Sequence, residues 1–294
     1  MNRIFYYNIT YRCNLNCVFC FSTSTCSKGK NMKVSTIVNS LHNFKPDEDD
    51  LIVLNGGEPS FHPEFYNLLL ALQSEYRSDI AIYSNGSILN VSKLKAKNSA
   101  NTFFVIPIHG NEGMHNKITQ VNGAFQHSIS NIKLLNKIGY RYKIKFIINE
   151  MMILENFNIA EFIYNQHLSP EEIIIARLNG TTKSKKNNVI IPTKQELVKY
   201  IQEQIKHLNG RYKIKLLDFP PCYIIGYSHQ ITVANTPVFY FNDINNVMDI
   251  RSYYKEIMIG SSCTDCNYFK ICKKMENSYL TLSFNENVLL LERE

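Results

Sequence analysis

The stretch that decides the fold is IFYYNITYRCNLNCVFC, residues 4–20. Its first part, Ile4–Ile9, is rich in aromatic and β-branched residues and predicts a β-strand. Its second part places Cys13, Cys17 and Cys20 in one short loop with C-x3-C-x2-C spacing. Clustered cysteines that directly follow a strand predict a metal or redox site at the carboxyl end of that strand.

Further apolar runs follow and alternate with helical patterns. The other predicted strands are 51–54, 80–83, 103–108, 142–148, 173–176 and 212–217. Apolar residues at helical spacing, and for the last helix a capping box of Thr193 and Glu196, predict helices at 34–41, 65–72, 125–135, 159–164 and 193–208. Repeated βα units imply a parallel sheet with right-handed crossovers. We therefore predict an α/β fold, a partial (β/α)6 TIM-like barrel.

The alternating pattern stops near Leu217. Residues 218–294 carry turns, aromatic residues and cysteines without a clear βα repeat. We expect the barrel to occupy residues 1–217 and a small C-terminal iron–sulfur module to occupy 218–294. Only twelve residues precede Cys13, so we expect no separate peptide-recognition domain before the barrel.

The composition is that of a globular protein. Hydrophobic residues make up 45% of the 294 residues and charged residues 19%, which suffices for a sizeable core. No run of about 18 apolar residues predicts a membrane span, and no signal peptide is evident, so a cytoplasmic location is expected. The net charge of +7 is spread along the chain. Its densest basic run, Lys183–Lys186, is predicted to be a solvated polar loop, so nucleic acid is not an expected partner, whereas an acidic leader peptide or a phosphorylated substrate stays open.

The eight cysteines form two groups separated by about two hundred residues. The groups are Cys13, Cys17, Cys20 and Cys26, and Cys222, Cys263, Cys266 and Cys272. Three thiolates in one loop can hold three irons of a [4Fe-4S] cubane and leave the fourth iron open to an outside ligand. A structural zinc site with Cys26 as fourth ligand is the alternative. Otherwise Cys26 is expected to be a thiol without a role.

The cysteine loop resembles the signature of the radical S-adenosylmethionine (SAM) superfamily, including Phe19 before the third cysteine. Residues 55–59, Asn-Gly-Gly-Glu-Pro, end the second strand and resemble the GGEP motif of that family. Residues 84–86, Ser-Asn-Gly, end the third strand and resemble its polar turn. The resemblance covers roughly residues 3–218.

The resemblance implies a set of site residues. Cys13, Cys17 and Cys20 would ligate a catalytic [4Fe-4S] cluster, whose open iron would bind the amino and carboxylate groups of SAM. The expected cofactor contacts are Phe19 near the adenine, Gly56 and Gly57 at the methionyl amine, Glu58 accepting a hydrogen bond from that amine, Ser84 and Asn149 on the ribose side, and Arg177 at the carboxylate. Reductive cleavage of SAM would give a 5′-deoxyadenosyl radical that takes a hydrogen atom from the substrate.

Some of these positions have plainer explanations. Arg177 could equally be a surface arginine at a strand end. His109 and His115 lie in the segment after the fourth strand, where similar enzymes often have a glycine and a histidine. They could contact the cofactor or the substrate, or they could simply belong to a polar loop or a helix start.

The second cysteine group has the spacing C-x2-C-x5-C at Cys263, Cys266 and Cys272, with Cys222 upstream. Four thiolates suit a fully ligated auxiliary [4Fe-4S] cluster or a structural zinc. The pattern resembles the twitch and SPASM modules of the same superfamily. Because only four cysteines are present, the shorter twitch-like form is the better match. Alternatively, Cys222 does not ligate and donates a hydrogen atom, as in peptide epimerases of the superfamily.

The resemblance implies an enzyme, a radical SAM oxidoreductase or peptide-modifying enzyme. We expect maturation of a ribosomally synthesised peptide by oxidation, crosslinking or epimerisation. The alternatives are a small-molecule sugar or alcohol dehydrogenase, an activase of a partner enzyme, and a metal-stabilised binding protein without turnover. The expected partners are the substrate and an electron donor such as flavodoxin or ferredoxin, with no membrane.

Overall fold

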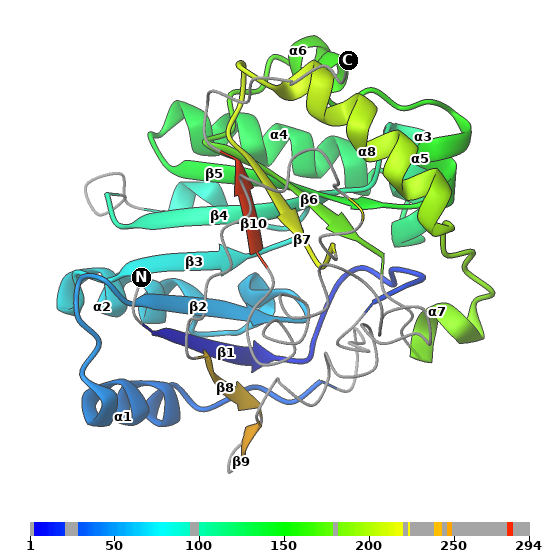
Figure 1. The fold of residues 1–294 in the computed structure, drawn as a ribbon. Helices are drawn as coiled ribbons and strands as arrows, with labels where there is room; N and C mark the ends of the chain where they lie inside the picture. The colour runs from blue at the N-terminus through cyan, green and yellow to red at the C-terminus, as the bar shows by residue number, and fades with distance from the viewer. Residues whose placement is uncertain are drawn as a thin grey trace, which may run out of the picture.

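The computed structural model describes residues 3–20, 29–94, 100–178, 182–219, 223, 238–242, 246–248 and 281–284. All seven predicted strands form within these ranges. They are β1 (Ile4–Thr10), β2 (Leu51–Gly56), β3 (Asp79–Tyr83), β4 (Thr102–Ile108), β5 (Arg141–Ile148), β6 (Glu172–Arg177) and β7 (Ile214–Leu217). They lie in chain order, and each pairs with the next in parallel. Their arrows point to the same side of the molecule in Figure 1, which confirms the α/β fold with a partial barrel.

The five helices predicted from apolar spacing are also present. They are α1 (Val34–Phe44), α2 (Phe65–Glu75), α4 (Ala124–Lys137), α6 (Ile159–Asn165) and α8 (Lys194–Leu208). The capping box of α8 is confirmed, because Thr193 and Glu196 exchange both of its hydrogen bonds. The 3-10 helices are η1 (Pro59–Phe61) and η2 (Val91–Lys93). No helix in the described ranges has the length and apolarity needed to cross a membrane.

Three further helices are present, namely α3 (Glu112–Thr119), α5 (Glu150–Leu154) and α7 (Thr182–Lys186). A helix start was one alternative for the segment of α3, and α5 and α7 were not predicted. The prediction of a loop at Lys183–Lys186 is wrong, because these residues form α7, whereas Lys185 and Lys186 are exposed to solvent as expected. The helix is held by tertiary contacts that its composition does not reveal. Lys183 Nζ donates to Asn16 Oδ1 at 2.8 Å, and Asn187 Nδ2 donates to the Val18 carbonyl at 2.8 Å.

Strands after Leu217 extend the same sheet at both edges. β8 (Val238–Asn242) pairs in parallel with β1, β9 (Asn246–Met248) pairs antiparallel with β8, and β10 (Thr281–Phe284) pairs antiparallel with β7. The sequence of this part predicted no such continuation, because short aromatic runs without flanking helices give no βα signal. The division at Leu217 stays a prediction.

The sheet separates two apolar layers. The larger lies between the strands and the covering helices and contains fully buried side chains such as Phe5, Ile52 and Phe104. The smaller lies on the other face of the strands, inside the partial barrel, and includes Val53 and Ile174. Side chains alternate between the two layers along each strand, so the sequence of a strand states which residues face the barrel interior.

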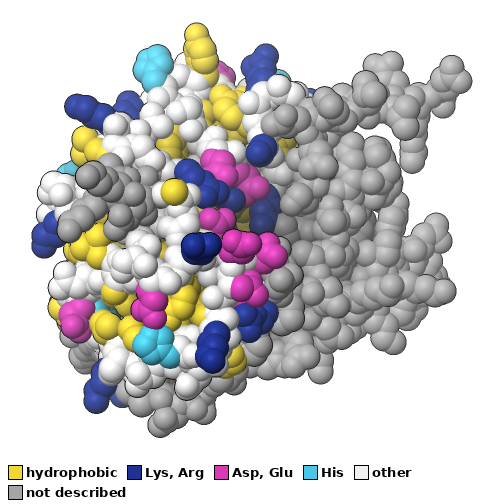
Figure 2. All heavy atoms as spheres, turned by 90° about the vertical axis from the view of Figure 1, so that its left-hand side faces the viewer, with side chains coloured by type: hydrophobic (Ala, Val, Ile, Leu, Met, Phe, Trp, Pro, Cys, Tyr) yellow, Lys and Arg dark blue, Asp and Glu magenta, His cyan; other side chains and the backbone are white. Residues whose placement is uncertain are grey.

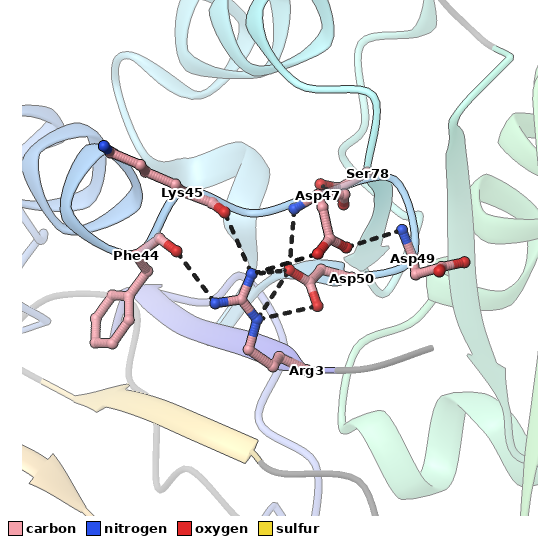
Figure 3. Close-up of polar contacts among 7 residues, drawn as sticks. All are labelled: Arg3, Phe44, Lys45, Asp47, Asp49, Asp50 and Ser78. Atoms are coloured by element: carbon pink, nitrogen blue, oxygen red, sulfur yellow. Dashed lines mark hydrogen bonds and ion pairs between the residues drawn. The ribbon is translucent and has the colours of Figure 1, made fainter.

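Arg3 fastens the amino ends of β1 and β2 to the end of α1 (Figure 3). Its Nε donates to the two Asp50 carboxylate oxygens at 3.2 and 3.0 Å, and its terminal nitrogens donate to the Phe44 and Lys45 carbonyls, both at 3.2 Å. The Asp50 side chain is fully buried. Burial by itself would raise the pKa of Asp50, but hydrogen bonds from Arg3 and the Asp47 amide, with the charge of Arg3, lower it overall.

Candidate active site

The cysteine loop lies at the carboxyl end of β1 and is held by three neighbouring segments. Two backbone amides of the loop donate hydrogen bonds to the end of α3. Asn16 N–H donates to the Thr119 carbonyl and Val18 N–H to the Ile118 carbonyl, both at 3.0 Å. α7 contacts it from the other side. The turn after β3 contributes Asn85, whose amide nitrogen lies 3.7 Å from Cys13 Sγ. The loop is therefore fixed by tertiary contacts on several sides.

Cys13, Cys17 and Cys20 all lie in this loop, and Cys13 is buried. Burial raises the pKa of the Cys13 and Cys17 thiols to about 12, and the proximity of the other cysteines contributes to both shifts. The three thiols are thus near enough to interact electrostatically. Within the described ranges, no three His, Cys, Asp or Glu side chains converge enough to hold a single metal ion. A cubane binds each of three thiolates through a separate iron, and the loop supplies three thiols. A structural zinc needs a fourth ligand, for which the sequence offers Cys26, outside the described residues.

Gly56 ends β2 where the chain passes the end of β1. Its φ is +144°, and a Cβ at this position would lie 2.2 Å from the Thr10 carbonyl oxygen. The next amide, Gly57 N–H, donates to that same oxygen at 2.7 Å. Only glycine permits both this backbone conformation and this approach. The close approach seen here is to the strand that carries the cysteine loop, and the predicted contact of Gly56 and Gly57 with the cofactor amine stays a prediction.

Glu58 is fully buried at the same edge of the sheet. Its Oε1 accepts from Ser60 N–H at 3.2 Å and from the Ser60 and Ser84 hydroxyls at 2.7 Å each, and its Oε2 accepts from Asn85 N–H at 2.7 Å. Burial raises the pKa of Glu58, and these hydrogen bonds oppose the rise. A carboxylate oxygen can accept about two hydrogen bonds. Oε2 therefore keeps one acceptor position for a donor such as a ligand ammonium.

Two predicted ribose contacts make local hydrogen bonds. The Ser84 hydroxyl donates to Glu58 and accepts from Gly86 N–H at 3.0 Å. Asn149 caps α5: its Oδ1 accepts from Met152 N–H at 3.2 Å, and its Nδ2 donates to the Ile147 carbonyl at 3.2 Å. Both side chains lie at the predicted edge, and their contact with a ribose stays a prediction.

Phe19 and the two histidines form an aromatic group beside the cysteine loop. The Phe19 ring meets the His109 ring edge-on at a centroid distance of 5.2 Å, and His109 stacks on His115 at 5.2 Å. Both histidines are buried. Burial lowers the pKa of His115 to about 4 and that of His109 well below its ordinary value. Both imidazoles are therefore neutral at neutral pH. The start of α3, predicted as one alternative for this segment, is confirmed, because His115 lies in that helix.

Arg177 ends β6 at the same edge. Its Nε is buried and has no hydrogen-bond partner in the described part of the chain. Its guanidinium carbon lies 5.8 Å from the centre of the Tyr223 ring. The Nε–H donor is thus unused among the described residues, and the predicted contact of Arg177 with the cofactor carboxylate stays a prediction. Cys26 and the four C-terminal cysteines, Cys222, Cys263, Cys266 and Cys272, lie outside the described residues.

The sequence analysis missed the roles of Asn85 and Thr10. Asn85 contacts Glu58 and Cys13 and also donates to Asn14 Oδ1 at 2.9 Å. Its position inside the turn at a strand end was the available signal. Thr10 accepts the Gly57 amide, and a backbone carbonyl leaves no signal in a sequence.

Comparison with known proteins assigns this chain to a family. A sequence model of the Radical SAM superfamily matches residues 7–165, more than half of the chain. The chain is 26% identical over 155 residues to a cysteine-type anaerobic sulfatase-maturating enzyme of Clostridium novyi, which covers 47% of this chain and 41% of that protein. It is 24% identical over 224 residues to a probable GTP 3′,8-cyclase of Saccharolobus islandicus, which covers 74% of this chain and 69% of that protein. The chain thus spans less than half the length of the first relative.

Solved structures share the fold at low identity. The structure of anSMEcpe with bound AdoMet and Cp18Cys peptide superimposes with a TM-score of 0.63 at 16% identity, over 96% of this chain and 92% of that one. Streptococcus suis SuiB bound to S-adenosylmethionine superimposes with a TM-score of 0.60 at 14% identity, over 92% and 71%. At these identities the likeness establishes the fold alone.

Proposed function

Because this chain belongs to the Radical SAM superfamily, we propose that it cleaves SAM reductively and uses the resulting radical on an organic substrate. The observation that carries the proposal is the juxtaposition, at one edge of the sheet, of the three-cysteine loop and the buried Glu58. Asn85 joins the two, since it contacts both Cys13 and Glu58. Cys13, Cys17 and Cys20 would hold a [4Fe-4S] cluster. When bound, the cluster supplies the electron that breaks the C5′–S bond of SAM and gives the 5′-deoxyadenosyl radical.

The described side chains would orient SAM by its charged ends. Glu58 would accept a hydrogen bond from the methionyl ammonium at Oε2, which has the remaining acceptor position. Arg177 would pair with the methionyl carboxylate through its guanidinium, whose Nε has no hydrogen-bond partner in the described part of the chain. Phe19 would lie against the adenine. Fixing both ends of the methionyl group aims the sulfonium and limits the conformations in which the bond can break.

For the C-terminal part we propose a twitch-like module that holds a second [4Fe-4S] cluster. Its support is the four-cysteine pattern of Cys222, Cys263, Cys266 and Cys272. With barrel residues 1–217 and module residues 218–294, the second cluster would accept the electron left on a substrate radical, giving a net two-electron oxidation. A zinc ion there would instead favour redox-neutral chemistry, and Cys222 outside the ligand set would serve as hydrogen-atom donor.

The substrate we propose is a ribosomally synthesised peptide. Support comes from structures of similar fold that hold peptides, SuiB bound to precursor peptide SuiA and anSMEcpe with the Cp18Cys peptide. A small-molecule substrate is the second candidate, favoured by the similarity to the probable GTP 3′,8-cyclase over 74% of this chain. Flavodoxin or ferredoxin would supply the electron in either case.

The test is iron and sulfide analysis with EPR of protein reconstituted without oxygen, together with detection of 5′-deoxyadenosine. We expect about eight irons per chain and one of two signals to shift when SAM is added. Cys17→Ala should abolish 5′-deoxyadenosine formation and leave the C-terminal cluster in place. Cys26→Ala is the matched control and should retain both. Cleavage of SAM by Cys17→Ala would refute the assignment of the catalytic loop.

A further inference from the structure

Three lysines, Lys143, Lys145 and Lys215, project from β5 and β7 toward the interior of the partial barrel, and Lys143 is the one that forms an ion pair in the described ranges. Lys143 Nζ donates to Glu172 Oε2 at 3.1 Å. Lys143, Lys215 and Glu172 all line a pocket of about 300 Å³ at the amino ends of the strands. Figure 2, which faces this end of the barrel, shows basic side chains interleaved with acidic ones. The charges at this end of the barrel are therefore largely balanced by one another.

Lys145 is the third lysine, and its side chain points toward the carboxyl ends of the strands. It lies in register with Ile174 of β6, which is itself in register with Lys215 of β7. Lys145 nevertheless does not line the pocket at the amino ends. It interacts electrostatically with His109 and Asp218, which follow the carboxyl ends of β4 and β7. Its side chain thus extends toward the end of the barrel that carries the cysteine loop.

No acidic side chain in the described ranges forms an ion pair with Lys145. Burial lowers the pKa of Lys145, and the negative charge of Asp218, which follows β7, opposes this. Close by, His109 Nδ1 is buried and has no hydrogen-bond partner among the described residues. Lys145 is in register with Pro107 of β4, two residues before His109, so the two side chains start from the same face of the sheet. Among the described residues, this part of the barrel thus combines a lysine outside any ion pair with a buried imidazole nitrogen that has no hydrogen-bond partner.

The cofactor carboxylate does not account for Lys145. Arg177, the proposed partner of that carboxylate, is in register with Ile148, three residues further along β5. At about 3.3 Å per residue, Lys145 lies about 10 Å deeper in the barrel than Arg177. The backbone positions of the two residues thus lie at different levels along the sheet.

We propose that Lys145 binds an anionic group of the substrate, a carboxylate or a phosphate, inside the barrel, with His109 lining the same space. This inference rests on the proposed function and names the class of substrate that the site takes. In a peptide substrate the group would be an acidic or phosphorylated side chain or a terminal carboxylate. A compact ammonium binds either anion as a point charge, so the two sources must be separated by experiment.

The experiment is calorimetric titration of the reconstituted, SAM-saturated protein with glutarate, with inorganic phosphate and with neutral glutaramide. We expect one of the anions to bind, glutaramide not to bind, and Lys145→Met to weaken the anion about tenfold or more. Lys145→Arg should retain binding and shows that a cation suffices. Lys143→Met is the matched control, because it removes a lysine from the same strand and face, and it should bind within about twofold of the parent. Glutarate or phosphate as the bound anion identifies the source.

Equal anion affinity in the parent and Lys145→Met would overturn the inference, as would an equal loss in Lys143→Met, or no binding of either anion. Loss of SAM affinity in Lys145→Met would also overturn it, since Lys145 would then serve the cofactor. These measurements require no turnover. Absence of 5′-deoxyadenosine from the parent protein would instead refute the proposed function and is recorded separately.

Discussion

Gly56→Ala should destabilise the protein far more than an ordinary glycine substitution. The φ of +144° lies in a region that only glycine adopts readily, which costs about 1–3 kcal/mol for another residue. The new Cβ would lie 2.2 Å from the Thr10 carbonyl oxygen, so β1 and β2 must separate there. That movement breaks the hydrogen bond from Gly57 N–H to Thr10, worth about 1 kcal/mol. We expect the free energy of unfolding to fall by about 3 kcal/mol or more.

Gly123→Ala provides the matched control. Gly123 also has a positive φ, +79°, but a Cβ there would meet nothing within 4 Å. It should therefore cost only the conformational term, about 1 kcal/mol. Urea unfolding followed by circular dichroism measures both variants, and iron content after reconstitution reports the cysteine loop, three residues beyond Thr10. Equal destabilisation by the two substitutions would refute the argument that the approach of Thr10 makes Gly56 necessary.

Three further substitutions test the site and the fold. Glu58→Gln places an amide among groups that all donate hydrogen bonds and removes the charge proposed for the SAM ammonium, so SAM affinity measured by calorimetry should fall about tenfold or more; unchanged affinity would contradict the role of Glu58. Arg3→Met leaves the Asp50 carboxylate buried without its counterion, which should cost about 2 kcal/mol at neutral pH, less than in a fully buried pair because the Arg3 side chain is 30% exposed. The folded-state pKa of Asp50 is lowered from 3.8, so the stabilisation by this pair is complete above pH 3.8 and is lost as the pH falls through the lowered pKa. The free energies of unfolding of the parent and Arg3→Met should therefore converge in acid. A constant difference between them down to the lowest pH would contradict the role of the Arg3–Asp50 pair. Cys222→Ala should remove about four irons per chain if Cys222 ligates the second cluster, whereas unchanged iron would favour the hydrogen-donor alternative.

Much of the barrel could be predicted because its strands are buried on both faces. Runs such as residues 51–54 and 173–176 carry enough apolar residues to identify themselves without tertiary information. The helices α5 and α7 were missed because they are short and depend on contacts made elsewhere. α7 is the clearest case, since its lysine-rich sequence indicates solvent exposure, while Lys183 in fact contacts the cysteine loop.

The sequence predicted where the site lies more completely than it predicted the contacts of each side chain. The cysteine loop, Glu58 and the turn at Ser84 were assigned to one edge of the sheet, because the carboxyl ends of parallel strands meet there. The partners of each side chain could not be predicted. A polar residue at a strand end can serve a ligand, a neighbouring side chain or the cap of the next helix, and the sequence is the same in each case. Ser84 contacts Glu58, and Asn149 caps α5.

Ion pairs lie at the amino ends of the strands, and two buried nitrogens without partners lie near the cysteine loop. At the amino ends, Arg3 pairs with Asp50 and Lys143 pairs with Glu172. At the carboxyl ends, Arg177 Nε and His109 Nδ1 are buried without partners in the described part of the chain. Buried polar atoms without partners are rare in folded proteins, because each costs about 1–3 kcal/mol. Under the proposed function, bound cofactor and substrate would supply partners for Arg177 Nε and His109 Nδ1 and would recover part of that cost.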